Sequence, residues 1–267
     1  VTLDIITTTG DRLLDRRLEP VGGKGAFLKE FEESMEADEI ELAVHSLKDV
    51  PTLTPEGLVL DALLESAAPR DALLSAGPGL EDLPPGAQVG TTSLRRQAQL
   101  AAVRPDLVLA DLRGNVDTRL RRIREGAFEA ILLAMAWLVR LGRADQVTQV
   151  LDPRSFVPAP GQGTIALECR GDDRAVREAV APLHHEPTAR AVTAERAFLA
   201  TLGGGCNVPL GAHATARGEG LDLVGFVGRV DGSTVLRAER QGEDAVSLGR
   251  ELGQDLLDRG AGDLLAR

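Results

Sequence analysis

The chain has 267 residues, of which 43% are apolar and 27% are charged, and its formal net charge is −11 at pH 7. This length suffices for two or three domains with cores of their own, and the composition is that of a globular protein in water. The negative charge disfavours non-specific binding to nucleic acid or to an anionic membrane surface. The sequence has no signal peptide and no uncharged apolar run of about 18 residues, so we expect a cytosolic protein that binds neither nucleic acid nor membrane.

Short apolar runs alternate with helical patterns through the first two thirds of the chain, which favours an α/β fold. Residues 70–157 are predicted to form a β-α-β-α-β-α unit with its ligand site at the carboxyl ends of its strands. Clusters of proline and glycine at 76–86 and 157–163 flank this unit as loops or hinges. The predicted strands are 40–44, 57–63, 87–90, 107–112 and 130–134, and the predicted helices begin at Leu94, Asn115 and Ala136.

The last third of the chain is predicted to form a separate α+β domain. A helix over 188–202 leads into a glycine-rich loop, and residues 210–241 alternate between apolar and polar in the manner of strands. Asp231-Gly232 is typical of a hairpin turn, and a final amphipathic helix is expected over 245–259.

Residues 90–96 join a predicted strand end to the start of a helix. The free backbone N–H groups and the positive end of the helix dipole favour an anion there, and Arg95 and Arg96 add charge where the dipole favours acids. This conflict indicates a ligand site, since the arginine fork binds a carboxylate or a phosphate through two hydrogen bonds. The alternative is simple capping by Thr92 or Ser93 with solvated arginines.

The next two predicted strand ends carry arginine as well. Arg113 and Gly114 follow one strand, Arg119 lies a turn further on, and Arg140 follows the other. Arginines at three successive strand ends would converge on one cleft, which suits a ligand with several carboxylates. Arg121, Arg122 and Arg124 are better interpreted as a solvated helix face.

Two segments near the start carry candidate functional side chains. Residues 44–51 place Lys48 and Asp49 just past a strand, where Asp49 can transfer a proton or stabilise a cation; a plain surface ion pair is the alternative. Residues 22–27 are rich in glycine but lack the spacing of a nucleotide-binding P-loop. We expect a mobile flap that carries Lys24 and Phe27.

The two cysteines differ in their surroundings. Cys169 lies in an apolar run and is interpreted as a strand residue, whereas Cys206 follows three glycines, 203–205. Because glycines let a bulky group approach the backbone, Cys206 is a candidate for holding or attacking a ligand. The cysteines show neither a disulfide framework nor the spacing of a zinc site, so we expect a reducing compartment and no metal.

Taken together, these motifs resemble those of the hydroxymethylbilane synthase (porphobilinogen deaminase) family. The resemblance follows the order of the chain and includes Pro160-Gly161-Gln162-Gly163 and Thr193-Ala194-Glu195-Arg196. Five linked motifs are more specific than any one of them. They are Val-Gly-Gly-Lys-Gly (21–25), His-Ser-Leu-Lys-Asp-Val-Pro (45–51), Gly-Thr-Thr-Ser-Leu-Arg-Arg-Gln (90–97), Leu-Arg-Gly-Asn-Val (112–116) and Gly-Gly-Cys-Asn-Val-Pro-Leu-Gly (204–211).

The resemblance implies a monomeric transferase with three domains. Two are α/β domains like those of a type II periplasmic binding protein, formed by 1–66 with 160–183 and by 67–159, and the active cleft would lie between them. The third, 184–267, is an α+β domain that carries the cysteine loop.

The resemblance also implies that Cys206 holds a dipyrromethane cofactor through a thioether. Four porphobilinogen units would be added in turn, each losing ammonia, before water releases the linear tetrapyrrole. Asp49 would be the catalytic residue, and Lys24 and Phe27 would lie on a lid. Cofactor binding is implied for Lys48, Asp49, Thr91, Thr92, Ser93, Arg95, Arg96 and Gly114, and substrate binding for Arg113, Arg119, Arg140, Lys24, Phe27 and Gln162.

The chain also departs from the family pattern. An N-terminal strand and helix with an arginine and a serine are expected but are not found in this sequence, which indicates either a fragment or compromised activity. Two other functions stay open. One is a non-catalytic clamp that binds a polycarboxylate or other anion, which would leave Cys206 unexplained. The other is an enzyme for a phosphate ligand, although we find no phosphate loop and no clear metal cluster.

Overall fold

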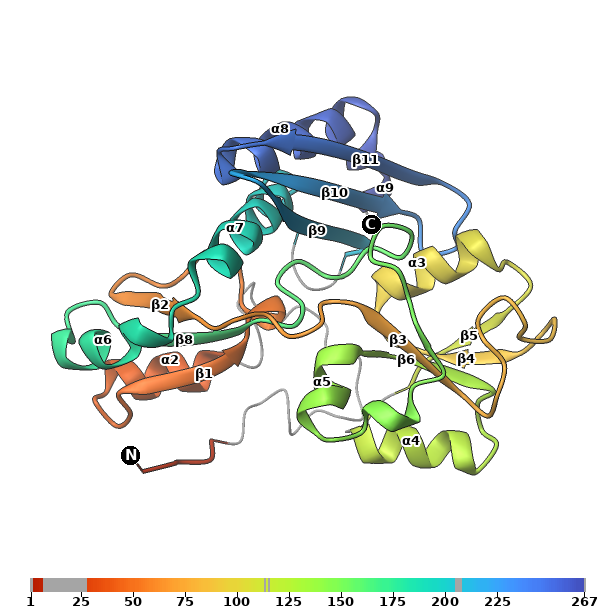
Figure 1. Ribbon diagram of the computed structural model, residues 1–267, viewed down its shortest axis with the longest axis horizontal. Helices are drawn as coiled ribbons and strands as arrows, with labels where there is room; N and C mark the ends of the chain where they lie inside the picture. Colours follow the sequence, from red (N-terminus) through yellow and green to blue (C-terminus); the bar gives the residue numbers. More distant parts are fainter. Residues whose placement is uncertain (1, 7–27, 113, 115, 205–207, 267) are drawn as a thin grey trace. The chain divides into compact units, whose positions relative to one another are not determined.

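The computed structural model describes residues 2–6, 28–112, 114, 116–204 and 208–266 (Figure 1). The chain divides into two compact units, one formed by Val1–Ser66 with Thr164–Ala189 and the other by Ala67–Gly163 with Arg190–Arg267. The boundaries of the three predicted domains stay a prediction.

The first unit contains a three-stranded antiparallel sheet in the order β1-β8-β2. Helices α2 and α6 pack on it through separate apolar clusters, Met35 with Ala43 and Leu58, and Val180 with Ala62 and Leu167. The elements are α2 (Lys29–Glu36), β1 (Leu42–Ser46), the 3-10 turn η1 (Leu47–Asp49), β2 (Leu58–Leu63), β8 (Ile165–Arg170), α6 (Arg174–Val180) and the 3-10 turn η3 (Ala181–Leu183).

The first part of the second unit is a five-stranded sheet in the order β5-β4-β6-β3-β7. Strand β4 runs parallel to β5 and β6, whereas β3 runs antiparallel to β6 and β7. The elements are β3 (Asp71–Ser75), β4 (Gln88–Gly90), α3 (Leu94–Val103), β5 (Val108–Ala110), α4 (Val116–Arg124), β6 (Ala130–Ala134), α5 (Met135–Arg140), η2 (Ala144–Gln146) and β7 (Gln149–Val150).

Alternating residues of β3 and β6 build a core on each face of this sheet. Leu73 and Leu132 pack with Leu100 of α3, whereas the intervening residues of the strands pack with Leu120 of α4 and Leu138 of α5. Every residue of β6 is buried because helices cover both faces. The predicted α/β unit is confirmed, but the prediction missed β3 and β7, so the sheet is mixed rather than built from βαβ repeats alone.

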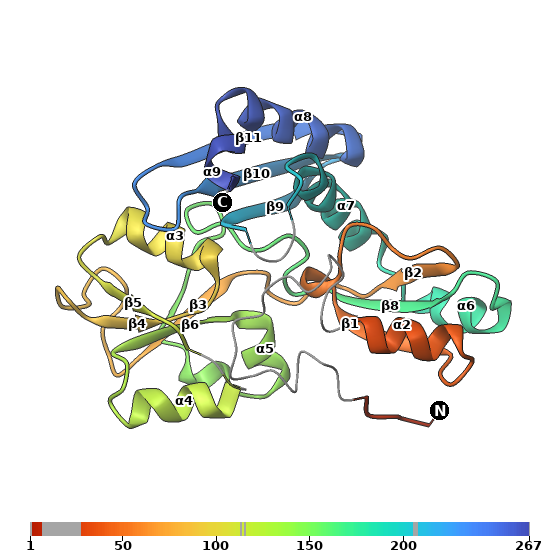
Figure 2. The ribbon, with the colours of Figure 1, turned by 180° about the vertical axis from the view of Figure 1, so that it is seen from behind.

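The C-terminal part has the predicted α+β composition. Its antiparallel sheet has the order β11-β10-β9, and Gly232 adopts a positive φ of 71° in the predicted hairpin turn. Figures 1 and 2 show α8 lying along this sheet, where Leu252 packs with Phe198 of α7 and Leu223 of β10. The elements are α7 (Glu186–Thr201), β9 (Leu210–Arg217), β10 (Gly220–Gly228), β11 (Val235–Gly242), α8 (Ala245–Asp258) and α9 (Ala261–Leu265).

The other face of the C-terminal sheet packs on helix α3. Val224 and Phe226 of β10 form a buried cluster with Ala98 of α3 and with Val157. The helix that carries Arg95 and Arg96 in its first turn is therefore fixed on one side by the C-terminal sheet.

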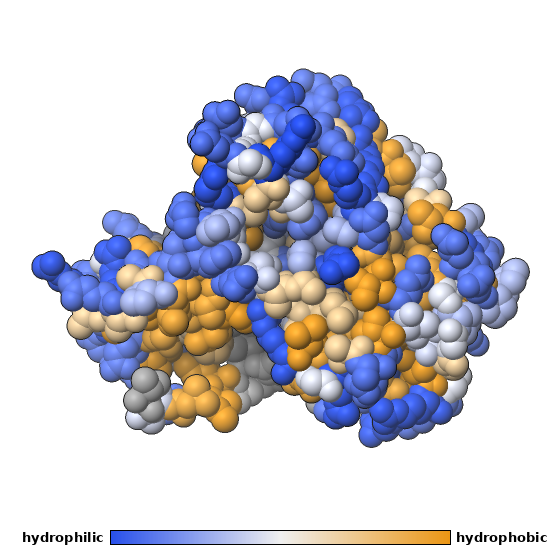
Figure 3. All heavy atoms as spheres, viewed as in Figure 1, coloured by the Kyte–Doolittle hydropathy of each residue, from blue (hydrophilic) through white to orange (hydrophobic). Residues whose placement is uncertain are grey.

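The predicted fold class, α/β domains followed by an α+β domain, is confirmed by these sheets and their covering helices. No described helix combines the length and the apolar character that crossing a membrane requires. Figure 3 shows apolar surface on the first unit. Val44 of β1 is 58% exposed.

Candidate functional site

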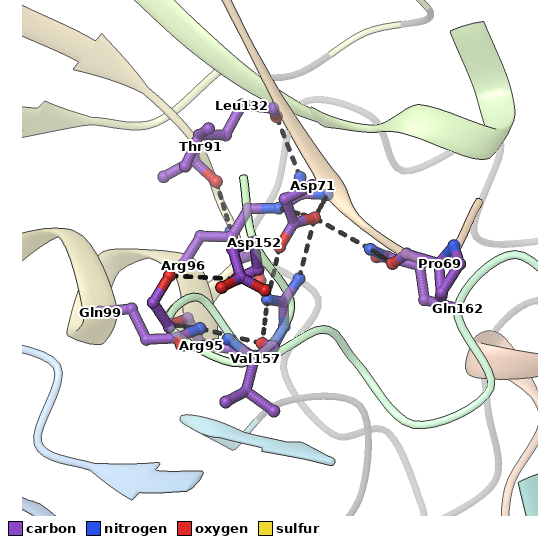
Figure 4. Close-up of polar contacts among 12 residues, drawn as sticks. Pro69, Asp71, Thr91, Arg95, Arg96, Gln99, Leu132, Asp152, Val157 and Gln162 are labelled. Carbon is purple, nitrogen blue, oxygen red and sulfur yellow. Dashed lines mark hydrogen bonds and ion pairs between the residues drawn. The ribbon is translucent and has the colours of Figure 1, made fainter. Parts of the chain in front are cut away.

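A buried carboxylate, Asp71, forms the centre of the candidate site (Figure 4). It is the first residue of β3 and binds two consecutive arginines from the first turn of α3. Arg95 Nη1 donates to Asp71 Oδ2 at 2.6 Å, and Arg95 Nη2 lies 3.3 Å from Oδ1. Arg96 donates to Oδ1 from Nη2 at 2.7 Å and from Nε at 3.1 Å. One carboxylate thus holds both guanidinium groups.

Backbone carbonyls complete the surroundings of the two arginines. Arg95 Nη1 donates to Val157 O at 2.7 Å, and Arg96 Nη1 donates to Leu132 O at 2.9 Å. Arg95 is 4% exposed and Arg96 6%, and Ser93 at the N-cap makes no capping hydrogen bond with its side chain. The alternative of capped, solvated arginines is therefore wrong. The sequence prediction missed their true partner, Asp71, although an acid opening the apolar run 72–74 was a usable signal.

Gln162 completes the contacts of Asp71. Its Nε2 donates to Asp71 Oδ1 at 3.0 Å and to Pro69 O at 2.7 Å, and the residue is buried. The family resemblance implies that Gln162 binds substrate, which stays a prediction, and its amide nitrogen supports Asp71. Glu195 of α7 holds the same loop in place, because its Oε2 accepts from Gly161 N at 2.7 Å and its Oε1 accepts from Ala214 N at 2.9 Å.

Arg119 adds a third cation to the cluster. Its Nε donates to Gly114 O at 2.8 Å, and its side chain is partly buried. Burial and the charge of Arg96 lower the pKa of Arg119 to about 10, so it stays protonated at neutral pH. Burial also lowers the pKa of Arg95, although Asp71 opposes this effect.

Asp71 stays ionised despite its complete burial. Burial by itself would raise the pKa of this carboxyl, but the charges of Arg95 and Arg96 and their hydrogen bonds outweigh it, so the pKa lies far below its ordinary value. Among the described residues, the cluster of Arg95, Arg96 and Arg119 with Asp71 thus has three positive charges against one negative charge. This surplus favours a ligand with carboxylates or phosphates.

The remaining predicted residues of this unit lie in the segments that follow β4, β5 and β6. Thr91 is buried, and its Oγ1 accepts from Ser93 N at 3.3 Å, whereas Thr92 is only partly buried. Gly114 has a φ of +104°, and a Cβ there would lie 2.9 Å from Thr118 Cγ2, so a glycine is required. Arg140 at the end of α5 is exposed and donates from Nη2 to Gly163 O at 2.7 Å.

Lys48 and Asp49 lie in η1 of the first unit, directly after β1. The turn is fixed by hydrogen bonds from Leu47 N to Thr164 O and from Val50 N to Leu47 O, both 3.0 Å. Asp49 is exposed to solvent on one side, but the surrounding protein atoms still desolvate its carboxyl. This burial raises the pKa of Asp49, and the charges of Lys48 and His45 oppose the rise only in part.

Four predicted site residues lie outside the described residues, namely Lys24, Phe27, Arg113 and Cys206. Their roles stay predictions. Cys169, in contrast, is fully buried in β8, which confirms its interpretation as a strand residue, and burial raises the pKa of its thiol.

Two family models match the chain. Residues 1–178 match "Porphobilinogen deaminase, dipyromethane cofactor binding domain", and residues 189–258 match "Porphobilinogen deaminase, C-terminal domain". A porphobilinogen deaminase from Syntrophobacter fumaroxidans is 50% identical over 99% of this chain and 87% of its own length. Another, from Roseiflexus sp. (strain RS-1), is 51% identical over 100% of this chain and 88% of its own length.

Among solved structures, an arginine-specific periplasmic binding protein from Salmonella typhimurium is similar with a TM-score of 0.33 and 11% identity, covering 59% of this chain and 70% of its own.

Proposed function

The chain belongs to the porphobilinogen deaminase family, and on this premise we propose which of its residues bind the acidic pyrroles and which one acts at the reacting centre. The protein is a transferase of tetrapyrrole biosynthesis, also called hydroxymethylbilane synthase, and contains the family's cofactor-binding domain. The non-catalytic clamp is not favoured, because both family models and the relatives are those of this transferase.

The surplus positive charge around Asp71 is the observation that carries the residue assignment. The guanidinium groups of Arg95 and Arg96 share the carboxylate of Asp71, and the charge of Arg96 acts on the nearby Arg119. Arg95 Nε is buried with no hydrogen-bond partner among the described residues. Burying such cations without anions is costly, so the cluster is completed by a ligand that brings carboxylates. Dipyrromethane carries acetate and propionate side chains, and it therefore fits the donors that are present.

When bound, the dipyrromethane supplies the pyrrole ring to which the first substrate unit is joined. Arg95 and Arg96 bind its carboxylates, with Lys48, Asp49, Thr91, Thr92, Ser93 and Gly114 completing the cofactor contacts. Cys206 provides the sulfur for the covalent anchor. The residues proposed to bind substrate are Lys24, Phe27, Arg113, Arg119, Arg140 and Gln162.

Asp49 is proposed as the catalytic residue. A carboxylate in crowded surroundings interacts strongly with a nearby cation, so it can stabilise positive charge that develops on a pyrrole ring. Its raised pKa also brings the carboxyl closer to the range in which it can accept and return a proton. The charge of Lys48 beside it favours the ionised form of Asp49.

Intact-mass measurement of the purified protein tests the proposal. We expect a mass excess of two pyrrole units with their acetate and propionate groups. The excess is expected to vanish in Cys206→Ser and to persist in the matched control Cys169→Ser, because Cys169 is buried in a strand. An active preparation whose mass equals that of the bare chain would contradict the assignment.

We also propose that the protein works as a monomer in the cytosol with porphobilinogen as its substrate. Support for the substrate comes from the relatives' printed name, porphobilinogen deaminase. Light scattering at micromolar concentration checks the monomer, and a mass of two chains would contradict it.

A further inference from the structure

We propose that Asp71 is a positioning residue, which presents Arg95 and Arg96 to the carboxylates of the ligand in one fixed orientation. This inference rests on the proposed function of the arginine pair. It goes further in assigning a role to an acidic residue that has the same sign of charge as the ligand.

The hydrogen bonds show how the orientation is set. Asp71 Oδ2 holds Arg95, whereas Oδ1 receives donors from Arg95, Arg96 and Gln162. A guanidinium has five N–H donors. Contacts to Asp71 and to the carbonyls of Val157 and Leu132 use three donors of each arginine. Each arginine therefore keeps two N–H groups outside these contacts, and for Arg95 one of them is the buried Nε.

The scaffold around Asp71 is rigid. Its β3 backbone pairs with Ala134 of β6, and its carbonyl accepts from Leu151 N at 2.9 Å. Arg95 and Arg96 are adjacent in α3, so without a shared anion two like charges would repel each other within a buried site. Asp71 removes that repulsion and limits the rotamers of both side chains, and a receptor held in place this way binds with a smaller loss of entropy.

The neutral partner of Asp71 preserves the positive charge of the cluster. Gln162 donates to Asp71 without adding a charge, so Arg95, Arg96 and Arg119 together still exceed Asp71. A glutamate at position 162 would have nearly the same shape but would supply a second anion, and it would compete with the ligand's carboxylates.

Three variants test the proposal: Asp71→Glu, Asp71→Asn and Gln162→Glu. Each is purified and compared with wild type by thermal melting, by the fraction carrying the two-pyrrole mass excess, and by kcat and KM. Asp106→Asn is the matched control, because it removes the partner of Arg104 in an exposed ion pair of the same unit. We call the fraction that carries the mass excess the loaded fraction, and we expect it to be the same in the control as in wild type.

Asp71→Glu keeps the charge but moves the carboxylate by one methylene. We expect a folded protein with a reduced loaded fraction, or a KM raised about tenfold or more with a smaller change in kcat, because small displacements of binding groups cost affinity. We expect Asp71→Asn and Gln162→Glu to lose the mass excess in the folded fraction. If Asp71→Asn does not fold, the other two variants decide.

Normal loading together with normal KM in Asp71→Glu would overturn the positioning role, and so would full loading of folded Asp71→Asn. Full loading of Gln162→Glu would overturn the role of the surplus charge. These failures are separable from a failure of the proposed function, which would show as a wild-type protein without the mass excess.

Discussion

His45 Nε2 and Glu168 Oε2 share a buried hydrogen bond of 2.9 Å that links β1 to β8. The two strands are antiparallel neighbours, with Ala43 opposite Glu168 and His45 opposite Ala166. Phe31 of α2 meets the His45 ring edge-on at 5.5 Å, which limits its orientation. Because η1 with Lys48 and Asp49 follows β1 directly, this contact stabilises the strand that places both residues.

Replacement of Glu168 by alanine is expected to destabilise the first unit. The change leaves the His45 ring buried without its carboxylate, and loss of a hydrogen bond to a charged group costs about 1.5–3 kcal/mol. Urea denaturation measures the difference. The control Glu178→Ala breaks an exposed pair with Arg174 and is expected to cost less than about 1 kcal/mol. An equal loss of unfolding free energy in Glu168→Ala and Glu178→Ala would contradict a stabilising role for the His45–Glu168 pair.

Turnover is expected to depend on the ionisation of Asp49. Burial raises the pKa of this carboxyl, so the acidic limb of the kcat/KM profile should lie at higher pH than for an ordinary aspartate. Activity is then present above that pKa and falls as the pH drops below it. Asp49→Asn should lower kcat sharply while substrate binding persists, and its residual activity should lack this limb. A limb that survives in Asp49→Asn would assign the ionisation to another group.

Asp71→Asn is expected to destabilise the second unit equally at pH 7 and pH 5. The change leaves two buried arginines without their anion, at a cost of about 3–5 kcal/mol. Since the pKa of Asp71 is lowered in the folded state, its contribution is complete above the unfolded pKa of about 3.9 and is lost as the pH falls toward the folded value. Urea titrations at pH 7, 5 and 3 measure the difference in unfolding free energy between wild type and Asp71→Asn. This difference should shrink only at pH 3.

Gly249→Ala is expected to lower the stability of the C-terminal part of the chain, where α8 packs on α7. A Cβ on Gly249 of α8 would overlap Ala194 O of α7, and overpacking of this kind costs about 1–3 kcal/mol. Thermal melting measures the effect. Gly262→Ala in α9 is the matched control, because nothing lies within 4 Å of its added Cβ. If Gly262→Ala loses as much stability as Gly249→Ala, overlap between α8 and α7 is not the cause of the loss.

Local signals predicted the second unit well. Strand β6 was predicted with its observed bounds, and the helix that begins at Leu94 lies where the apolar spacing indicated. The prediction missed β3, because its five residues begin with a charge and lead directly into the proline- and glycine-rich stretch 76–86, which resembles a loop. The pairs that β3 forms with β6 and β7 supply the missing constraint, and no local period encodes them.

The order and spacing of the motifs determined the family, since these short patterns depend on residues close together in the chain. The sequence also located Arg95 and Arg96 in the first turn of the helix that follows a strand, because helix starts are local features. Only the tertiary structure decided that Arg95 and Arg96 share Asp71, 24 and 25 positions away, and that His45 pairs with Glu168, 123 positions away. A buried cation requires an anion, but strand pairing and helix packing select which of the 41 acidic residues provides it.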